Sequence, residues 1–392
     1  MNLIQTPSSK NDSIDLEARV KIITVLGTRP EIIRLSETIK KLDRFTDHVL
    51  VHTNQNYDYE LNNVFFEELD LRKPDYLLDV KAQSVGEQIG KILIQTEQVM
   101  IKEKPDAVLI LGDTNSSLSC IVAKRLKIPI FHMEAGNRCF DERVPEEINR
   151  RIVDHTSDIN LPYTEHARRN LLREGLSPEN IFVTGSPMAE VLKVNMEKIE
   201  KSTILQDLNL KKDAFFLISI HREENVDCPQ NIKVILKTLN MIANRYGYPL
   251  IVSTHPRTQK RINELEITNN GLICFHKPFG IFDFIKMQKN AYCTLSDSGT
   301  IHEDAGIMGI PALVIRESTE RPEAFDTGNL ILTGLDPQII ISSIEIVRNQ
   351  FERRVDFLPP VDYQDVNVSE KMVRLIMGRS KIVPKKKYYI GT

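Results

Sequence analysis

A short stretch in the first half of the chain, residues 131–151, gathers side chains that could perform acid–base chemistry. It reads FHMEAGNRCFDERVPEEINRR and holds one histidine, several carboxylates and several arginines. The apolar run 128–131 is typical of a buried strand, so Glu134 is predicted at the carboxyl end of that strand, where open α/β sheets bind ligands. Glu146 and Arg150 are four residues apart on a predicted helix and share one face. The alternative interpretation is a surface helix of paired charges.

Four further predicted strands also end in side chains that could bind or react with a ligand. A tight turn after the first of them would point backbone N–H groups and an arginine at an anion. Asp113, which follows the second of these strands, either takes part in chemistry or caps the next helix. These strands and the polar residues that follow them are 20–26 with Arg29, 107–111 with Asp113, 215–219 with His221 and 250–253 with His255.

The stretch SDSGTIHED in the second half of the chain predicts a helix start suited to a phosphate. Ser298 and Gly299 would offer a hydroxyl and free backbone N–H groups, while Glu303 or Asp304, about one turn later, could reach ribose hydroxyls. The alternative is an N-cap with favourable dipole charges. A charged loop follows, and its Arg321 could pair with a pyrophosphate.

The composition is that of a packed protein without a broad basic surface. Of 392 residues, 41% are apolar and 27% charged, and the formal net charge is −3, so an extended nucleic-acid surface is not expected. The five cysteines form no CxxC pair, which fits reduced thiols rather than a thiolate metal site. Residues 1–19 lack the features of a signal peptide, and no apolar run is long enough to span a bilayer. We therefore expect a cytoplasmic protein with a flexible amino-terminal arm.

Apolar runs alternate with amphipathic helical segments along the chain. This alternation predicts an α/β fold with parallel sheets, and the length predicts two Rossmann-like domains that face each other across a cleft. No GxGxxG turn is present, so a nicotinamide-dependent activity is not supported. The predicted segments are an arm at 1–19, a first domain at 20–190, a second domain at 191–364 and a basic tail at 385–392, for which a solvated terminus is the simplest interpretation.

Six short motifs, taken together and in order, resemble the non-hydrolysing UDP-N-acetylglucosamine 2-epimerase family. The resemblance implies a glycosyltransferase-B-like fold, a helix at about 365–384 that returns to the first domain, a UDP site on the second domain, a homodimer, and neither a metal nor a nicotinamide cofactor. The motifs are Gly27-Thr28-Arg29-Pro30-Glu31, Gly112-Asp113-Thr114, His132-Met133-Glu134-Ala135-Gly136, Pro145-Glu146-Glu147-Ile148-Asn149-Arg150, Asp297-Ser298-Gly299 and Thr319-Glu320-Arg321-Pro322-Glu323.

Members of this family eliminate UDP across C1–C2 of a UDP-amino-sugar and then add it back, with the proton on the other face of C2. The chemistry needs acid–base groups near C2 and a cradle that holds UDP throughout. By match with the family motifs, the residues implied to be catalytic are Asp113, Glu134, Glu146 and His221. Those implied to bind the substrate and UDP are Arg29, Arg34, Arg150, His255, Ser298, Gly299, Glu303, Asp304 and Arg321.

Several positions depart from the usual family pattern. Arg34 stands where lysine is usual and cannot serve as a proton donor, Glu223 and Thr300 replace an arginine and a glycine, and the loop 137–144 is short. These features resemble the branch that converts UDP-2-acetamido-2,6-dideoxy-L-talose to UDP-N-acetyl-L-fucosamine, a precursor of capsule and O-antigen sugars. The alternative substrate pair is UDP-N-acetylglucosamine and UDP-N-acetylmannosamine. More distant alternatives are a glycosyltransferase of the same fold and an inactive sugar-nucleotide-binding regulator.

The short loop also leads to a prediction about the substrate's C6 group. Cys139, Phe140 and Val144 could form an apolar wall suited to the methyl group of a 6-deoxy sugar. The alternative is that these side chains only pack the loop.

Overall fold

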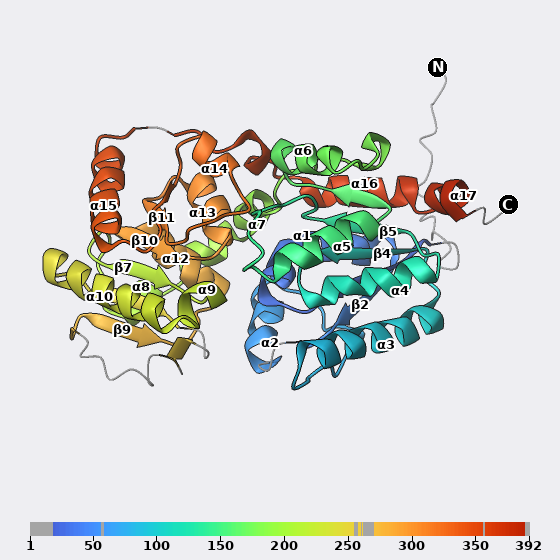
Figure 1. The fold of residues 1–392 in the computed structure, drawn as a ribbon, viewed down its shortest axis with the longest axis horizontal. Helices are drawn as coiled ribbons and strands as arrows, with labels where there is room; N and C mark the ends of the chain where they lie inside the picture. Colours follow the sequence, from blue (N-terminus) through green and yellow to red (C-terminus); the bar gives the residue numbers. More distant parts are fainter. Residues whose placement is uncertain are drawn as a thin grey trace, which may run out of the picture.

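Two α/β lobes lie side by side in the computed structural model (Figure 1). The structure describes residues 19–55, 59–254, 258, 259, 261, 270–355 and 357–388. His255 and residues 1–18 of the predicted arm are outside the described residues, so the predictions made for them are not addressed below.

The first lobe contains a parallel sheet of six strands in the order β3-β2-β1-β4-β5-β6. This is the order of a Rossmann sheet, in which the chain reverses its direction of winding between β1 and β4 and leaves a crevice at their carboxyl ends. The strands are β1 (Lys21–Leu26), β2 (Asp47–His52), β3 (Tyr76–Leu77), β4 (Ala107–Leu111), β5 (Ile130–Met133) and β6 (Ile159–Leu161).

Helices cover both faces of this sheet because alternate strand residues point to opposite sides. Ile22 and Leu109 belong to an apolar cluster with α1, α2, α7 and the later helix α16 (Val368–Arg379), whereas Ile23 and Val108 belong to a second cluster with α3, α4 and α5. The helices of this lobe are α1 (Arg29–Phe45), α2 (Tyr59–Glu68), α3 (Val85–Glu103), α4 (Cys120–Arg125), α5 (Glu146–Thr156), α6 (Glu165–Arg173) and α7 (Met188–Lys201).

The second lobe repeats the plan with another parallel sheet of six strands in the order β12-β11-β10-β7-β8-β9. Read from β7, the first strand of this sheet in the chain, the order is again that of a Rossmann sheet. The strands are β7 (Phe216–Ser219), β8 (Leu250–Ser253), β9 (Ile273–His276), β10 (Cys293–Ser296), β11 (Ala312–Val314) and β12 (Ile331–Leu332).

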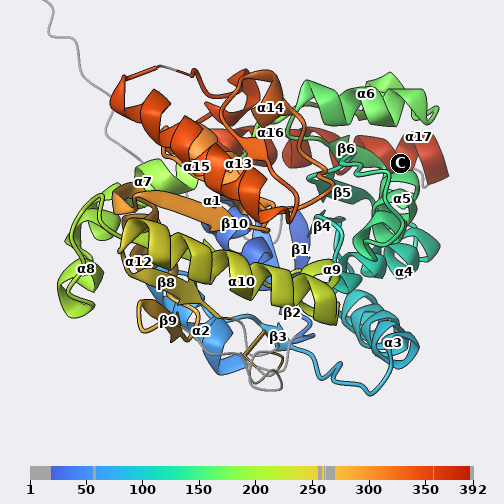
Figure 2. The ribbon, with the colours of Figure 1, turned by 60° about the vertical axis from the view of Figure 1, so that its left-hand side comes forward.

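Alternate residues along β7 and just before it point to opposite faces of the sheet, so helices again cover both faces. Phe216 and Ile218 pack with α10 and α15, and Phe215 and Leu217 pack with α8 and α12. Figure 2 shows α10 crossing the front of this lobe. The helices are α8 (Ile204–Asp207), α9 (Glu223–Val226), α10 (Pro229–Tyr246), α12 (Ile281–Asn290), α13 (Thr300–Met308), α14 (Glu323–Asp326) and α15 (Pro337–Glu352).

The chain then returns to the first lobe. Helix α16 (Val368–Arg379) packs against α1 and contributes Met372 and Ile376 to the core of the first lobe. Helix α17 (Ile382–Tyr388) includes the first residues of the predicted basic tail, and Lys387 Nζ lies 3.1 Å from Oδ1 of the buried Asp158. The boundaries of the two domains remain predictions.

The lobes meet along both apolar and polar contacts. Helix α12 of the second lobe packs on α2 and α7 of the first, where Ile281 and Ile285 join the core of the first lobe. Glu68 Oε2 accepts a hydrogen bond of 2.8 Å from the Ile281 backbone at the start of α12. This packing brings the carboxyl ends of the two sheets toward each other.

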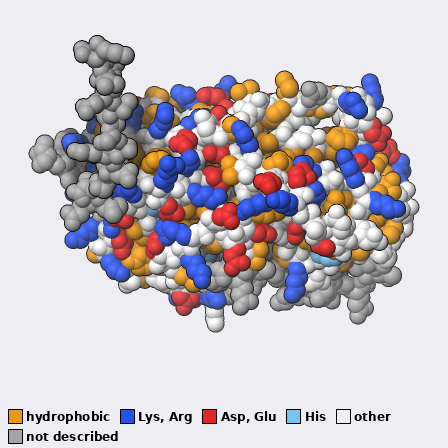
Figure 3. Space-filling model, turned by 180° about the vertical axis from the view of Figure 1, so that it is seen from behind, with side chains coloured by type: hydrophobic (Ala, Val, Ile, Leu, Met, Phe, Trp, Pro, Cys, Tyr) orange, Lys and Arg blue, Asp and Glu red, His pale blue; other side chains and the backbone are white. Residues whose placement is uncertain are grey.

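The surface in Figure 3 carries acidic and basic side chains mixed together over both lobes. On this face, the mixture agrees with the small net charge. Among the helices that the structure describes, none combines the length and apolar character that a membrane span requires.

Candidate active site between the two sheets

A cavity of about 320 Å³ lies between the lobes at the ends of the strands. A second cavity, of about 100 Å³, shares five of its lining residues, Pro30, Arg34, His221, Ser298 and Thr300. Of the predicted site residues that the structure describes, all except Glu303 line one or both cavities. The first cavity is lined by Thr28, Pro30, Glu31, Arg34, Leu111, Gly112, Asp113, Thr114, Glu134, Glu146, Arg150, His221, Arg222, Ser298, Gly299, Thr300, Glu320 and Arg321.

The turn after β1 is held by Glu31, a residue to which the sequence interpretation assigned no role. Its Oε2 accepts hydrogen bonds from the Gly27 and Thr28 backbones at 2.6 and 2.7 Å, and its Oε1 accepts one of 2.7 Å from Thr114 Oγ1. A Cβ on Gly27 would lie 2.1 Å from Thr53 Oγ1, so only glycine fits there. Burial raises the pKa of Glu31 to about 7. Glu31 thus joins the β1 turn to the loop that carries Asp113.

Asp113 and Glu146 face the cavity from two different elements. Arg150 Nε donates a 2.7 Å hydrogen bond to Asp113 Oδ2, which fixes the position of this side chain. Glu146 begins α5, and its Oε2 lies 4.0 Å from Arg222 Nη1. Burial, followed by the nearby charge of Asp113, raises the pKa of Glu146. Two carboxyl groups in different surroundings are a common arrangement for acid–base catalysis.

Glu134 follows β5 in an unusual backbone conformation. Its φ of 63° is left-handed, which is uncommon for a residue other than glycine and concentrates at functional sites. Arg321 Nη2 donates a 2.6 Å hydrogen bond to Glu134 Oε1, and Arg34 Nη1 lies 3.6 Å from Oε2. Because Arg321 belongs to the second lobe, this carboxylate also joins the two lobes.

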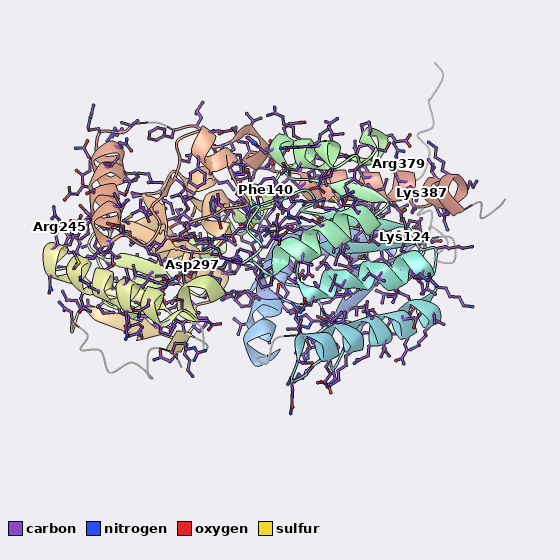
Figure 4. The ribbon with its side chains drawn as sticks, viewed as in Figure 1. Lys124, Phe140, Arg245, Asp297, Arg379 and Lys387 are labelled. Carbon is purple, nitrogen blue, oxygen red and sulfur yellow. The ribbon has the colours of Figure 1, made fainter. Side chains whose placement is uncertain are left out.

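His221 and Arg222 follow β7 and are held by Asp297, at the end of β10. The fully buried Asp297 carboxylate accepts backbone hydrogen bonds from His221 at 3.0 and 3.1 Å and from Arg222 at 3.0 Å, and another from Asn225 Nδ2 at 3.0 Å. Figure 4 labels Asp297 in the second lobe. The sequence interpretation included Asp297 in a motif but gave it no role. The sequence did contain a signal for such a role, because Asp297 is an acidic residue directly after a predicted buried strand.

Ser298, Gly299 and Thr300 form the start of α13 on the cavity wall. Ser298 Oγ lies 3.0 Å from Thr300 Oγ1, and Gly299 is the N-cap residue. The positive end of the helix dipole at such a helix start favours an anionic group. Within the described ranges, no group of three or more His, Cys, Asp or Glu side chains is arranged to hold a metal ion.

Comparison with known proteins decides the family. The model of the UDP-N-acetylglucosamine 2-epimerase family matches residues 39–377, which is most of the chain. The chain belongs to this family. It is therefore an isomerase that acts as an epimerase, and its predicted α/β fold of two Rossmann-like domains is confirmed.

Solved and curated relatives cover nearly the whole chain. A UDP-N-acetylglucosamine 2-epimerase structure from Rickettsia bellii is 47% identical, with a TM-score of 0.87, and covers 95% of this chain and 100% of its own. The Methanocaldococcus jannaschii UDP-GlcNAc 2-epimerase in complex with UDP-GlcNAc and UDP is 38% identical, with a TM-score of 0.86 and coverages of 92% and 100%. A UDP-2,3-diacetamido-2,3-dideoxy-D-glucuronate 2-epimerase from Pseudomonas aeruginosa is 34% identical, with coverages of 83% and 91%.

One predicted ligand-binding residue of this epimerase lies behind the cavities. Glu303 is fully buried and forms an ion pair with Arg34, lies 3.2 Å from Arg321 Nη1 and accepts a hydrogen bond from Ser186. It lines neither cavity, whereas the next residue, Asp304, lines the second. Glu303 thus orients the two arginines, a role that depends on contacts distant in sequence.

Cys139, Phe140 and Val144 were predicted to form an apolar wall of the site. This prediction is wrong for both cavities, because none of the three residues lines either of them. Phe140 is 69% exposed, Val144 is buried, and Cys139 Sγ lies 3.3 Å from Glu147 Oε2. Figure 4 labels Phe140 near the junction of the lobes. These side chains belong to the packing and surface of the loop.

Asp304 predicts a pH dependence of stability. Burial, followed by the charge of Glu303, raises the pKa of Asp304 from its ordinary value of 3.8 to about 7, and its Oδ1 has no hydrogen-bond partner among the described atoms. The folded protein holds this proton more tightly than the unfolded chain, so ionisation of Asp304 lowers the free energy of unfolding as the pH rises from about 4 to about 7.

Asp304→Asn removes this ionisation and should flatten that part of the profile. In urea unfolding at pH 5 and pH 8, we expect the stability of the variant relative to the parent to be greater at pH 8. If the difference in stability between variant and parent were the same at pH 5 and pH 8, the raised pKa of Asp304 would be contradicted.

Proposed function

We propose that the protein is a UDP-N-acetylhexosamine 2-epimerase that eliminates UDP and then adds it back. The observation that carries the proposal is the cavity itself. Asp113, Glu134 and Glu146 from the first lobe line it together with the helix start at Ser298 and with Arg321 from the second lobe. Acid–base groups thus face an anion-binding helix start across one cavity. The UDP-sugar epimerases among the relatives support the substrate class.

The C2 proton of such a sugar is not adjacent to a carbonyl group, so it is not acidic by itself. In the proposed first step a carboxylate removes this proton, the C2–H electron pair forms the C1–C2 double bond, and the C1–O bond breaks to release UDP. In the second step UDP oxygen attacks C1 again, while a proton is delivered to the opposite face of C2. The reaction is balanced without an external oxidant or reductant, because the proton and UDP leave and return.

The surroundings of the carboxylates support different roles for them. Asp113 faces the cavity and is held at 2.7 Å by the Arg150 guanidinium, so it is placed to accept the proton. Glu146 has a raised pKa and its nearest cation, Arg222, is 4.0 Å away, so it is the better proton carrier. We propose that Asp113 and Glu146 act on opposite faces of C2, and that Glu134, which is paired with Arg321, links proton transfer to binding of the diphosphate.

The finer proposal concerns the sugar. The departures at Arg34, Glu223 and Thr300 and the short loop 137–144 favour the 6-deoxy-L-talose and L-fucosamine pair. The names of the relatives favour UDP-N-acetylglucosamine as the substrate. We propose the 6-deoxy pair as the preferred substrate. Because Phe140 and its neighbours do not line the cavities, this proposal rests on the departures alone.

Proton NMR of the purified protein with each UDP-sugar in turn tests the proposal. We expect epimerisation without any added acceptor. We also expect turnover of the 6-deoxy pair to be at least about tenfold faster than turnover of UDP-N-acetylglucosamine, because burying the C6 hydroxyl of the latter without a hydrogen-bond partner would cost about 1–3 kcal/mol. Faster turnover of UDP-N-acetylglucosamine would contradict the substrate proposal alone. A requirement for an acceptor would identify a glycosyltransferase, and binding without turnover would identify a regulator.

We also propose that the protein acts as a homodimer in the synthesis of precursors for capsule or O-antigen sugars. Both statements rest on what the resemblance to this family implies. Light scattering of the purified protein would measure the oligomeric state directly.

A further inference from the structure

A buried histidine, His302, connects the helix start at Ser298 to the loop that carries Arg321. It lies on α13, is completely buried and lines neither cavity. Its Nδ1 forms a 3.2 Å hydrogen bond with the Gly299 carbonyl oxygen, and its Nε2 forms one of 3.0 Å with Thr319 Oγ1. Thr319 Oγ1 also accepts a 3.2 Å hydrogen bond from the Arg321 backbone N–H. One imidazole thus bridges two separate segments of the cavity wall.

The atoms around the ring give this chain of hydrogen bonds a single direction. The Gly299 oxygen is a carbonyl and can only accept, so Nδ1 of His302 carries a proton. The unprotonated Nε2 accepts from the Thr319 hydroxyl, and the oxygen of that hydroxyl accepts from the Arg321 backbone. Burial lowers the pKa of His302 to about 4, which agrees with a neutral ring that carries one proton. Every donor in the chain therefore meets an acceptor.

Two packing contacts hold the same junction. The ring of Phe325, on α14, meets the His302 ring edge to face, with the centroids 5.6 Å apart and the planes at 85°. A Cβ placed on Gly299 would lie 2.7 Å from Glu320 Oε1 and 3.5 Å from Arg321 Nε, so the loop packs directly on the helix start. Hydrogen bonds and close packing together keep the loop at a fixed distance from α13.

The two bridged segments supply different parts of an anion site. The start of α13 offers the positive end of a helix dipole, and Arg321 offers a guanidinium that can pair with phosphate oxygens. The Arg321 guanidinium lies 2.6 Å from Glu134 and 3.2 Å from Glu303, and these carboxylates orient the side chain. The bridge through His302 and Thr319 instead holds the backbone from which that side chain extends.

We propose that His302 is a positioning residue for the diphosphate, which acts through Thr319 to set the distance between the start of α13 and the backbone of Arg321. The inference rests on the proposed function for the identity of the ligand as UDP. It assigns no proton transfer to His302, because this side chain lines neither cavity. Without the bridge, the ligand itself must bring the loop and the helix start together, and the free energy needed for this appears as weaker binding.

Thr319→Val tests the bridge, because valine keeps the shape of threonine and removes the hydroxyl. In calorimetric titration we expect the Kd for UDP to rise roughly threefold to tenfold, the scale of one lost hydrogen bond. The KM for the UDP-sugar should rise with it while kcat falls less, because the diphosphate is bound in both the ground state and the transition state. Thr319→Ser keeps the hydroxyl and should bind UDP within about twofold of the parent.

Thr333→Val separates this role from a general loss of stability. Thr333 is 7% exposed and directly follows β12 in the same lobe. Its hydroxyl donates to the carbonyl oxygens of Gly334 at 2.9 Å and Val314 at 3.3 Å, and it lines neither cavity. This variant also loses a buried hydroxyl, but its Kd for UDP should stay within about twofold of the parent, since the anion site is untouched. Equal loss of UDP affinity in Thr319→Val and Thr333→Val would overturn the role.

Nitrogen-15 NMR of the unmodified, histidine-labelled protein tests the bridge without a ligand or a variant. At pH 7 we expect the His302 ring, assigned through its contact with Phe325, to carry a proton on Nδ1 and none on Nε2. A proton on Nε2 would overturn the bridge. UDP binding without epimerisation would remove the proposed function and leave the role of His302 standing. Normal epimerisation by the parent with unchanged UDP affinity in Thr319→Val would overturn that role alone.

Discussion

Replacing Glu134 with Gln is expected to lower kcat by at least about 100-fold, the usual scale for a group that takes part in proton transfer. Gln keeps the shape of the side chain but removes the charge that pairs with Arg321 and lies near Arg34. UDP affinity should not decrease, because Arg321 is released from its carboxylate partner and stays available to the diphosphate. Steady-state turnover and calorimetric titration with UDP measure the two quantities.

Glu142→Gln is the matched control for this substitution. Glu142 lies on the loop after Glu134, and its side chain is 78% exposed and lies 3.4 Å from Arg151. We expect this variant to retain the turnover of the parent. If Glu134→Gln also retained nearly full activity, Glu134 would have no part in the mechanism.

Replacing Arg150 with Met is expected to lower the free energy of unfolding by about 3–5 kcal/mol and to abolish most activity. Arg150 is 4% exposed, with Nε 2.7 Å from Asp113 Oδ2 and Nη1 2.8 Å from Glu147 Oε2. Its removal leaves the buried Glu147 carboxylate without its closest cation and frees Asp113 from its fixed position. Urea unfolding followed by circular dichroism measures the loss of stability.

The neighbouring Arg151 provides the control for burial. Its side chain is 46% exposed, and its contacts with Glu142 and Glu147 are 3.4 and 3.7 Å long. Arg151→Met should change stability by no more than about 1 kcal/mol, as for other exposed ion pairs. A similar loss of stability in both variants would mean that burial of the Arg150 cluster is not what stabilises this part of the fold.

The fold and much of the site were predictable because strand ends are local signals. The apolar run before Glu134 and the run before Asp113 are short, β-branched and followed by polar residues, so both the strands and their carboxyl ends could be located. A parallel sheet brings such ends together whatever the lengths of the connections. The cavity accordingly contains the predicted Asp113, Glu134, Glu146 and His221.

What could not be predicted depends on contacts between residues distant in sequence. Glu303 and Asp304 are adjacent in the chain, yet one pairs with Arg34, 269 residues away, and only the other reaches a cavity. The place of Asp297 after a buried strand was visible in the sequence, but its partners, the backbone N–H groups of His221 and Arg222, were not. The apolar wall failed for a more local reason: Phe140 has a left-handed backbone, with φ of 55°, and its side chain is 69% exposed.

Deuterium incorporation tests the central claim most directly, because elimination and re-addition require the C2 proton to leave the sugar. The purified protein is incubated with its UDP-sugar in deuterium oxide, and the product is examined by proton NMR and mass spectrometry. Elimination and re-addition predict deuterium at C2 of the product, together with traces of free UDP and of the glycal. Epimerised product that retains the original proton at C2 would contradict the mechanism.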